Sequence, residues 1–143
     1  MDGGKVIVLC LVMPCGACIS HAKTTYNVVE GYKTTNPGKV VFYLADSDAS
    51  IATCSTMNSW ATTNTMPNST RFSSASIKGT DYAPAAMQKT IVMCGPNHTV
   101  VYNKNGSSNT TAALKTAING CLTTGIADPI NEVAALQVFP NPA

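Results

Sequence analysis

Two runs of consecutive apolar residues lie in the first third of the chain, at 6–13 and 40–45. Runs of this length without polar alternation are typical of strands that are covered on both faces of a sheet. Between them, from Ile19 to Tyr32, apolar residues recur at steps of three and four. This spacing predicts a helix with one buried side. Because the helix joins two buried strands, the sequence predicts a parallel, right-handed β-α-β unit.

The middle of the chain predicts a second helix and then a polar loop. Asp46-Ser47-Asp48 is expected to open this helix, since Ile51, Cys54 and Met57 follow at helical spacing on one side. Residues 62–76 are polar and contain a proline, and they are expected to form a loop.

The last third has the pattern of a hairpin followed by a helix. Two short β-rich runs, 90–94 and 98–102, flank a Gly-Pro-Asn turn and predict an antiparallel pair. A final helix is expected from a cap at Ser108 or Asn109 through about Asn119, with Gly120 at its end. The predicted order of elements is β-α-β-α-β-β-α.

Four residues, Cys15-Gly16-Ala17-Cys18, stand where the first strand leads into the first helix. At a helix N-terminus, unpaired backbone N–H groups and the helix dipole favour a thiolate. We therefore expect Cys15 to be exposed and acidic, and Cys18 to lie beneath it. The alternative is a structural disulfide that clamps the start of the helix.

The composition narrows the class of protein. The chain has 143 residues, of which 11% are charged, with a net charge of +2. One domain of this size can bury a core without disulfides, so the six cysteines call for another explanation. Cysteine-rich, charge-poor composition favours an extracytoplasmic protein. No basic patch indicates nucleic acid, and the first apolar run is too short to span a membrane.

The element order with C-x-x-C at the first helix resembles the thioredoxin fold, in particular the TlpA-like branch of extracytoplasmic thiol-disulfide oxidoreductases. The resemblance implies one domain over 1–122, a three-layer α/β sandwich around a mixed sheet of four or five strands. It also implies that Cys15 attacks a substrate disulfide and that Cys18 resolves the mixed disulfide. The implied partners are protein thiols and disulfides, with no cofactor and no bound metal.

Three positions depart from the family's pattern. Pro14 replaces the usual Trp before the first cysteine, and Leu9 replaces the buried carboxylate that accepts the second thiol's proton. The aligned region 85–90 lacks the cis-proline that lies beside the dithiol, and Pro84 falls too early for that position. Gln88 or Lys89 is expected to lie next to the sulfurs instead. The residues expected to line the substrate groove are Pro14, Gly16, Ala17, Gln88, Lys89 and Thr90.

The chain's last residues, 135–143, resemble the opening strand of the C-terminal sorting domain of type IX secretion. The ending Phe-Pro-Asn-Pro-Ala carries this resemblance. It implies that 123–134 is a linker and that the domain is secreted or displayed on a bacterial surface. The alternative is a proline-containing tail that matches by chance.

The other cysteines and His21 allow several roles. Cys10 and Cys94 are expected to be nearly opposite on neighbouring strands, as packed thiols rather than a strained disulfide. Cys54 is expected to be buried, or else to act as a third redox partner, and Cys121 to be an exposed, unpaired thiol. His21 is expected to be solvated or to cap the helix; the less favoured alternative is that Cys15, Cys18 and His21 bind Cu(I) or Zn.

The sequence as a whole favours thiol-disulfide exchange on extracytoplasmic proteins through Cys15 and Cys18. Two other classes of function remain open. One is a non-catalytic thioredoxin-fold module that binds another protein, which the missing carboxylate and missing cis-proline favour. The other is a metal-handling protein.

Overall fold

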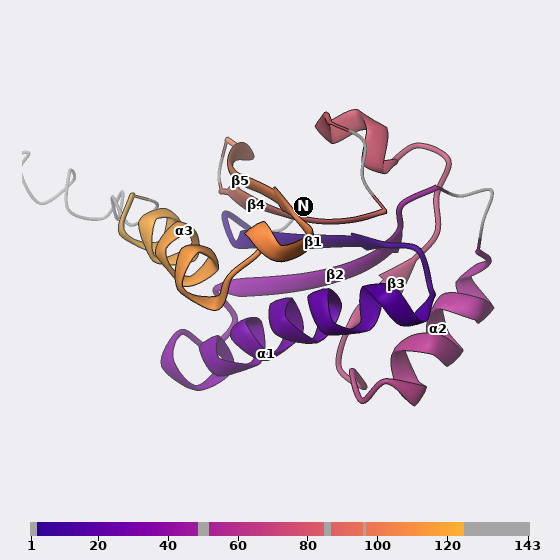
Figure 1. Ribbon diagram of the computed structural model, residues 1–143. Helices are drawn as coiled ribbons and strands as arrows, with labels where there is room; N and C mark the ends of the chain where they lie inside the picture. Colours follow the sequence, from indigo (N-terminus) through magenta and orange to yellow (C-terminus); the bar gives the residue numbers. More distant parts are fainter. Residues whose placement is uncertain (1–2, 49–51, 85–86, 96, 125–143) are drawn as a thin grey trace, which may run out of the picture.

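The computed structural model describes residues 3–48, 52–84, 87–95 and 97–124. Within them a five-stranded sheet has the order β3-β2-β1-β4-β5 (Figure 1). The strands are β1 (Val6–Val12), β2 (Val40–Asp46), β3 (Thr70–Phe72), β4 (Gln88–Cys94) and β5 (Thr99–Asn105). β1, β2 and β3 are parallel, whereas β4 is antiparallel to both β1 and β5. The thioredoxin-like α/β fold and the mixed sheet predicted from the sequence are confirmed.

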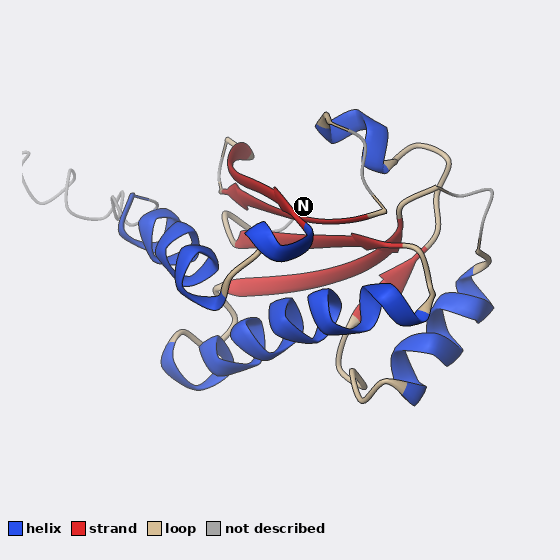
Figure 2. Cartoon of the chain, in the orientation of Figure 1, coloured by secondary structure: helices blue, strands red, loops and turns tan. Residues whose placement is uncertain are grey.

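Three α-helices contribute to one core on one face of the sheet (Figure 2). They are α1 (Ile19–Thr35), α2 (Cys54–Thr63) and α3 (Thr111–Thr124). Their buried residues pack with alternate residues of the strands, among them Val8, Cys10 and Val12 of β1. This alternation follows from the pleat of a strand, in which successive side chains point to opposite faces.

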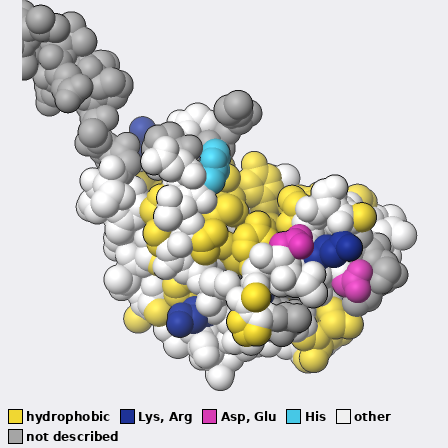
Figure 3. All heavy atoms as spheres, turned by 90° about the horizontal axis from the view of Figure 1, so that it is seen from above, with side chains coloured by type: hydrophobic (Ala, Val, Ile, Leu, Met, Phe, Trp, Pro, Cys, Tyr) yellow, Lys and Arg dark blue, Asp and Glu magenta, His cyan; other side chains and the backbone are white. Residues whose placement is uncertain are grey.

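The second face of the sheet has a smaller core. Leu9, Leu11, Ala45 and Ile91 are buried there, against residues that include Ile77 and Tyr82 of the segment 73–84. This segment contains the short 3-10 helix η2 (Gly79–Tyr82) and is the described part of the outer layer on this side. Seen from above, hydrophobic side chains gather in the middle of the molecule (Figure 3). A groove of about 300 Å³ on this face is lined by Ile7, Leu9, Tyr43, Phe72, Ile77, Tyr82 and Met93.

Two elements between β2 and β4 differ from the sequence expectation. Asp46 is the last residue of β2 and does not open a helix; its carboxylate accepts hydrogen bonds from the N–H groups of Asp48 and Ala52, at 3.2 and 2.8 Å. α2 begins at Cys54, where the hydroxyl of Thr53 caps it by accepting from the Thr56 N–H. The segment predicted to be a loop contains β3, which pairs with β2 over three residues only. A strand this short leaves no periodic signal in the sequence.

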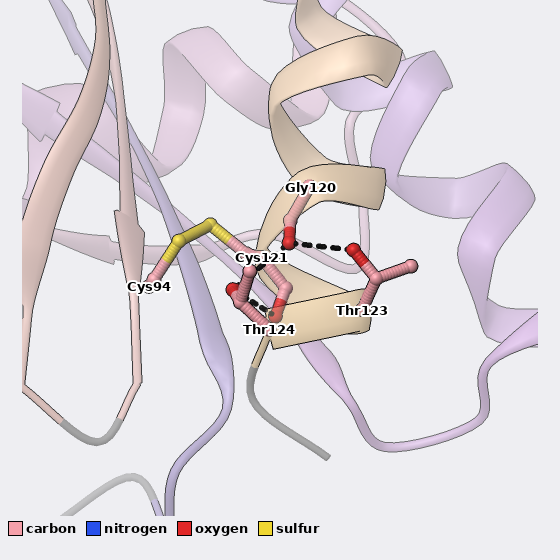
Figure 4. The surroundings of a disulfide bond; sticks show 5 residues. All are labelled: Cys94, Gly120, Cys121, Thr123 and Thr124. Carbon is pink, nitrogen blue, oxygen red and sulfur yellow. Dashed lines mark hydrogen bonds between the residues drawn. A yellow bond between two sulfur atoms is a disulfide. The ribbon is translucent and has the colours of Figure 1, made fainter. Parts of the chain in front are cut away.

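The final helix is longer than predicted. α3 continues past Gly120 to Thr124, and the hydroxyls of Thr123 and Thr124 donate to the Gly120 carbonyl at 3.0 and 2.9 Å (Figure 4). Two residues of the predicted linker 123–134 therefore belong to the helix. The rest of that linker and the predicted sorting segment 135–143 lie outside the described residues.

Candidate active site

The backbone after β1 places the C-x-x-C at the start of a helix. The Met13 N–H donates to the Met87 carbonyl at 3.0 Å, which continues the pairing of β1 with the segment before β4. The chain then turns, and η1 (Gly16–Cys18) leads directly into α1. Cys15 is the N-cap of η1 and Cys18 the N-cap of α1. Both thiols therefore lie at the positive end of a 17-residue helix.

The two thiols form a close pair of unequal exposure. Both are free, and their Sγ atoms are 3.7 Å apart and share a hydrogen bond. Cys15 is half-buried, whereas Cys18 is fully buried and its Sγ donates to the Met87 carbonyl at 3.7 Å. The outer sulfur is thus available to an incoming disulfide and the inner one is not.

The electrostatics of the pair favour ionisation of Cys15. Burial by itself would raise the pKa of Cys15, but the hydrogen bond shared with the Cys18 thiol and those with the backbone N–H groups of Cys18 and Ala17 lower it below its usual value. The pKa of Cys18 is raised to about 11, mainly by burial and in addition by the neighbouring Cys15. One thiol of the pair is therefore prepared as a nucleophile while the other keeps its proton.

The expected groove residues are divided between the surface and the interior. Gly16 and Ala17 are exposed and Pro14 is half-buried, all beside Cys15. Gln88 is half-buried, and Lys89 and Thr90 are buried. The structure therefore does not place Lys89 or Thr90 on an accessible groove wall.

Lys89 lies on the opposite face of the sheet from the dithiol. It pairs with Leu11, which belongs to the second core, and its ammonium donates to the carbonyls of Tyr82 and Pro84. Burial lowers the pKa of Lys89. The prediction that Lys89 holds the Cys15 thiolate is therefore wrong, because side chains alternate across a strand and Lys89 falls on the wrong side.

Met87 is the residue that the sequence reasoning missed. Its carbonyl accepts hydrogen bonds from both the Met13 N–H and the Cys18 thiol, and Met87 is 51% exposed. The Ala83–Pro84 peptide is cis, but the contact beside the dithiol is made by Met87, three residues later. The region 85–90 that was compared with the family's proline contains Met87, and its position directly before β4 is the signal that could have pointed to it.

His21 is buried in a chain of polar side chains beneath the start of α1, and is not solvated as expected. Its Nε2 lies 2.9 Å from the Thr90 hydroxyl, which lies 2.8 Å from the Thr25 hydroxyl. The Asn109 amide donates to Thr25 at 2.9 Å, and the Tyr102 hydroxyl donates to Asn109 at 3.0 Å. Burial lowers the pKa of His21, which favours the neutral imidazole. We call these five residues the buried polar chain.

Cys10 faces the same core as Cys18, but it does not lie opposite Cys94. Its partner across the sheet is Thr90, since β1 and β4 are in the register that joins Met13 to Met87. Burial raises the pKa of Cys10 to about 12, although hydrogen bonds with Thr90 and Thr25 oppose this. Leu9 stands where the resembled family has a buried carboxylate, and its side chain faces the second core.

The predictions for Cys94, Cys121 and Cys54 are wrong. Cys94 and Cys121 form a disulfide with 5.0 Å between their Cα atoms, which joins the end of β4 to α3 (Figure 4). Cys121 is therefore neither exposed nor unpaired. Cys54 is exposed and not buried, because it is the first residue of α2 and its Sγ points toward the Ser73 carbonyl at 3.9 Å.

The described residues do not gather a metal site. No cluster of three or more His, Cys, Asp or Glu side chains suited to a metal occurs among them. His21, the third ligand in the metal alternative, is held by Thr90. The metal alternative therefore has no geometric support in this part of the chain. The described helices also include none with the length and hydropathy that a membrane span requires.

Comparison with known proteins supports the fold. No family model and no curated protein matches the sequence. Among solved structures, a thioredoxin-like protein from Aeropyrum pernix superimposes with a TM-score of 0.65 and 14% identity, over 82% of this chain and 78% of the other. A thiol-disulfide oxidoreductase from Bacteroides fragilis gives 0.60 and 11%, over 79% and 81%. ScoI of Arabidopsis thaliana, solved with copper bound, gives 0.63 and 12%, over 85% and 86%.

Proposed function

We propose that this protein exchanges disulfides with other proteins through Cys15 and Cys18. The observation that carries the proposal is the asymmetry of the pair: a half-exposed sulfur with a lowered pKa lies 3.7 Å from a buried sulfur whose pKa is raised to about 11. A structural clamp would require neither the asymmetry nor the exposure. The oxidoreductases among its structural neighbours support the same chemistry.

The proposed reaction uses each sulfur once. The Cys15 thiolate attacks one sulfur of a substrate disulfide; that S–S bond breaks, and the other substrate sulfur leaves as a thiolate. Cys18 then loses its proton to water and attacks Cys15, which breaks the mixed disulfide and releases the second substrate thiolate. The substrate gains two electrons and the pair becomes a disulfide. A small dithiol or a second protein dithiol returns the pair to the reduced state.

The surroundings of Cys18 predict slow turnover. Leu9 is directed into the second core. Cys10 faces the same core as Cys18, but its pKa is raised to about 12, so it keeps its own proton and cannot accept the one that Cys18 loses. The absence of a positioned general base typically costs about 10²- to 10⁴-fold. We therefore expect insulin reduction to be slower than that of a thioredoxin by a factor in this range.

The direct test is a redox titration. Reduced protein is equilibrated in glutathione buffers of increasing oxidation, the remaining thiols are alkylated, and the mass of the peptide that contains Cys15 and Cys18 is measured. We expect one reversible two-electron transition in this peptide. If the pair stayed reduced in every buffer, or stayed oxidised in every buffer, it would not be an exchange site.

The competing proposal is a non-catalytic binding module, favoured by the position of Lys89 away from the sulfurs and by Leu9. The Cys15→Ser, Cys18→Ser variant separates the two. If this variant retains the biological activity of the protein, the binding module is correct.

We also propose that the protein is secreted or displayed on the cell surface through 135–143. The Cys94–Cys121 disulfide supports an oxidising compartment.

A further inference from the structure

A cleft of about 420 Å³ lies between the dithiol loop and α2. Pro14, which directly precedes Cys15, forms one side. The other side consists of five residues of α2, namely Ser55, Thr56, Ser59, Trp60 and Thr63, followed by Asn64. Cys15 does not line the cleft itself but directly follows Pro14 in the chain, so the cleft begins one residue from the half-exposed sulfur. It lies on the α2 side of the dithiol and not on the Met87 side, where the sequence reasoning had placed the substrate.

The α2 wall of the cleft is held in place from behind. The guanidinium of Arg71 on β3 donates to the Asn58 carbonyl at 3.1 Å, the Thr62 hydroxyl at 2.9 Å and the Met66 carbonyl at 2.7 Å. At the other end, the Asp46 carboxylate holds the N–H of Ala52 just before the helix. α2 is thus fixed relative to β2 and β3, and a ligand entering the cleft meets a wall that is already formed.

The chemistry of the wall is neutral. None of the described lining residues carries a charge; four are hydroxyl side chains, one is an amide, and Trp60 presents a half-buried ring. A hydroxyl both donates and accepts hydrogen bonds, so this surface matches the alternating N–H and C=O groups of an extended peptide. A charged side chain would find no ionic partner among these lining residues.

We propose that the cleft binds an extended, uncharged segment of the substrate protein, next to the cysteine that Cys15 attacks. The inference rests on the proposed exchange function and adds the substrate's flanking sequence to it. Binding along α2 holds the substrate disulfide at the start of α1. Selection then depends on neutral flanking residues rather than on charge.

The test uses peptides without cysteine, so that docking is measured apart from chemistry. Trp60 is the single tryptophan of the chain, and its fluorescence reports on the cleft directly. An extended Ser/Thr/Asn peptide is titrated into the reduced protein, in parallel with peptides of equal length rich in Glu and rich in Lys. We expect a saturable change with the neutral peptide and about tenfold weaker binding of both charged peptides, which corresponds to about 1.4 kcal/mol.

Two lysine substitutions test whether the peptide binds in the cleft. Ser59→Lys puts a cation into the cleft and should weaken binding of the neutral peptide about tenfold. Ala112→Lys puts the same charge on an exposed position of α3 and should leave binding unchanged. Equal binding of the three peptides, no response of Trp60 to any of them, or equal effects of the two lysines would each overturn the inference.

A second readout separates this inference from the proposed function. Oxidation of the reduced protein by bis(2-hydroxyethyl) disulfide needs the dithiol but no flanking peptide. We expect wild-type protein to react with this small disulfide, and we expect Ser59→Lys to raise the KM for a neutral peptide disulfide more than the KM for the small disulfide. If wild-type protein failed to react with the small disulfide, the exchange function would be wrong; if both substrates slowed equally in Ser59→Lys, the docking site would be wrong.

Discussion

The molecule contains two cysteine pairs at opposite ends of the same sheet, and the pairs differ in bonding and in surroundings. Cys15 and Cys18 follow the end of β1, are three residues apart and remain free thiols. Cys94 and Cys121 lie near the beginning of β1, are 27 residues apart in sequence and are bonded. Because only the second of these pairs is bonded, it closes a loop and restrains the unfolded chain, whereas the first pair does not.

The two pairs differ in local geometry, and under the proposed function this difference decides which pair reacts. The Cys15–Cys18 pair lies at a helix N-terminus, where backbone N–H groups lower the pKa of the outer thiol. The Cys94–Cys121 pair lies at the end of a strand and near the C-terminal end of a helix, where Cys121 is buried. The buried polar chain lies between the two pairs and joins α1 to β4 and β5.

The largest expected effect separates the chemical roles of the two pairs. Cys15→Ser should abolish exchange with any disulfide, since no other described thiol is both near the helix start and accessible. Cys94→Ser with Cys121→Ser should retain exchange at 25 °C. The rate of oxidation by a small disulfide measures both variants. If Cys15→Ser still exchanged disulfides, another thiol would be the attacking nucleophile, and the exposed Cys54 would be tested first.

The second prediction concerns stability. Replacing both Cys94 and Cys121 by Ala should lower the free energy of unfolding by about 3 to 4 kcal/mol, the value expected for a loop of this length. Cys15→Ala with Cys18→Ala is the matched control and should change it much less. Urea denaturation followed by circular dichroism measures both. A smaller loss for the 94/121 variant than for the control would reverse the assignment of roles.

The third prediction concerns the order of alkylation within the redox pair, measured in a Cys54→Ser background. A thiol whose pKa is about 11 has roughly 100-fold less thiolate at neutral pH than one at the ordinary value of 9.0. Because the pKa of Cys15 is lowered, iodoacetamide should label Cys15 at least about 100-fold faster than Cys18. Peptide mass spectrometry after short exposures gives the two rates. Faster labelling of Cys18 would contradict the proposed order of attack.

The smallest expected effect concerns the buried polar chain. Burial lowers the pKa of His21 in the folded state, so the unfolded chain binds more protons below about pH 6.5. His21 therefore contributes full stability above that pH and loses it as the pH falls. His21→Asn should flatten the decrease in unfolding free energy between about pH 6.5 and 5. Denaturation series at several pH values test this; identical slopes for wild type and His21→Asn would contradict it.

Much of this protein could be read from its sequence because the signals are local. The apolar runs, the helical spacing after Cys18 and the strand-to-helix position of the C-x-x-C each depend on residues close together in the chain. They predicted the order of the main elements, the thioredoxin-like fold and the placement of Cys15 above Cys18. β3 and the start of α2 were missed, since one is very short and the other is delayed by the turn that Asp46 organises.

Several outcomes that the sequence did not determine depend on the register between β1 and β4. That register is fixed where Met13 meets Met87, which places Thr90, and not Cys94, opposite Cys10. It turns Lys89 into the second core and leaves Cys94 at the strand end, where α3 brings Cys121 to it. A shift of one residue would exchange every face, and no local pattern encodes such a shift. The sequence by itself determined the main strands and helices and the position of the C-x-x-C at the start of the first helix, whereas only the tertiary packing decided which side chains meet.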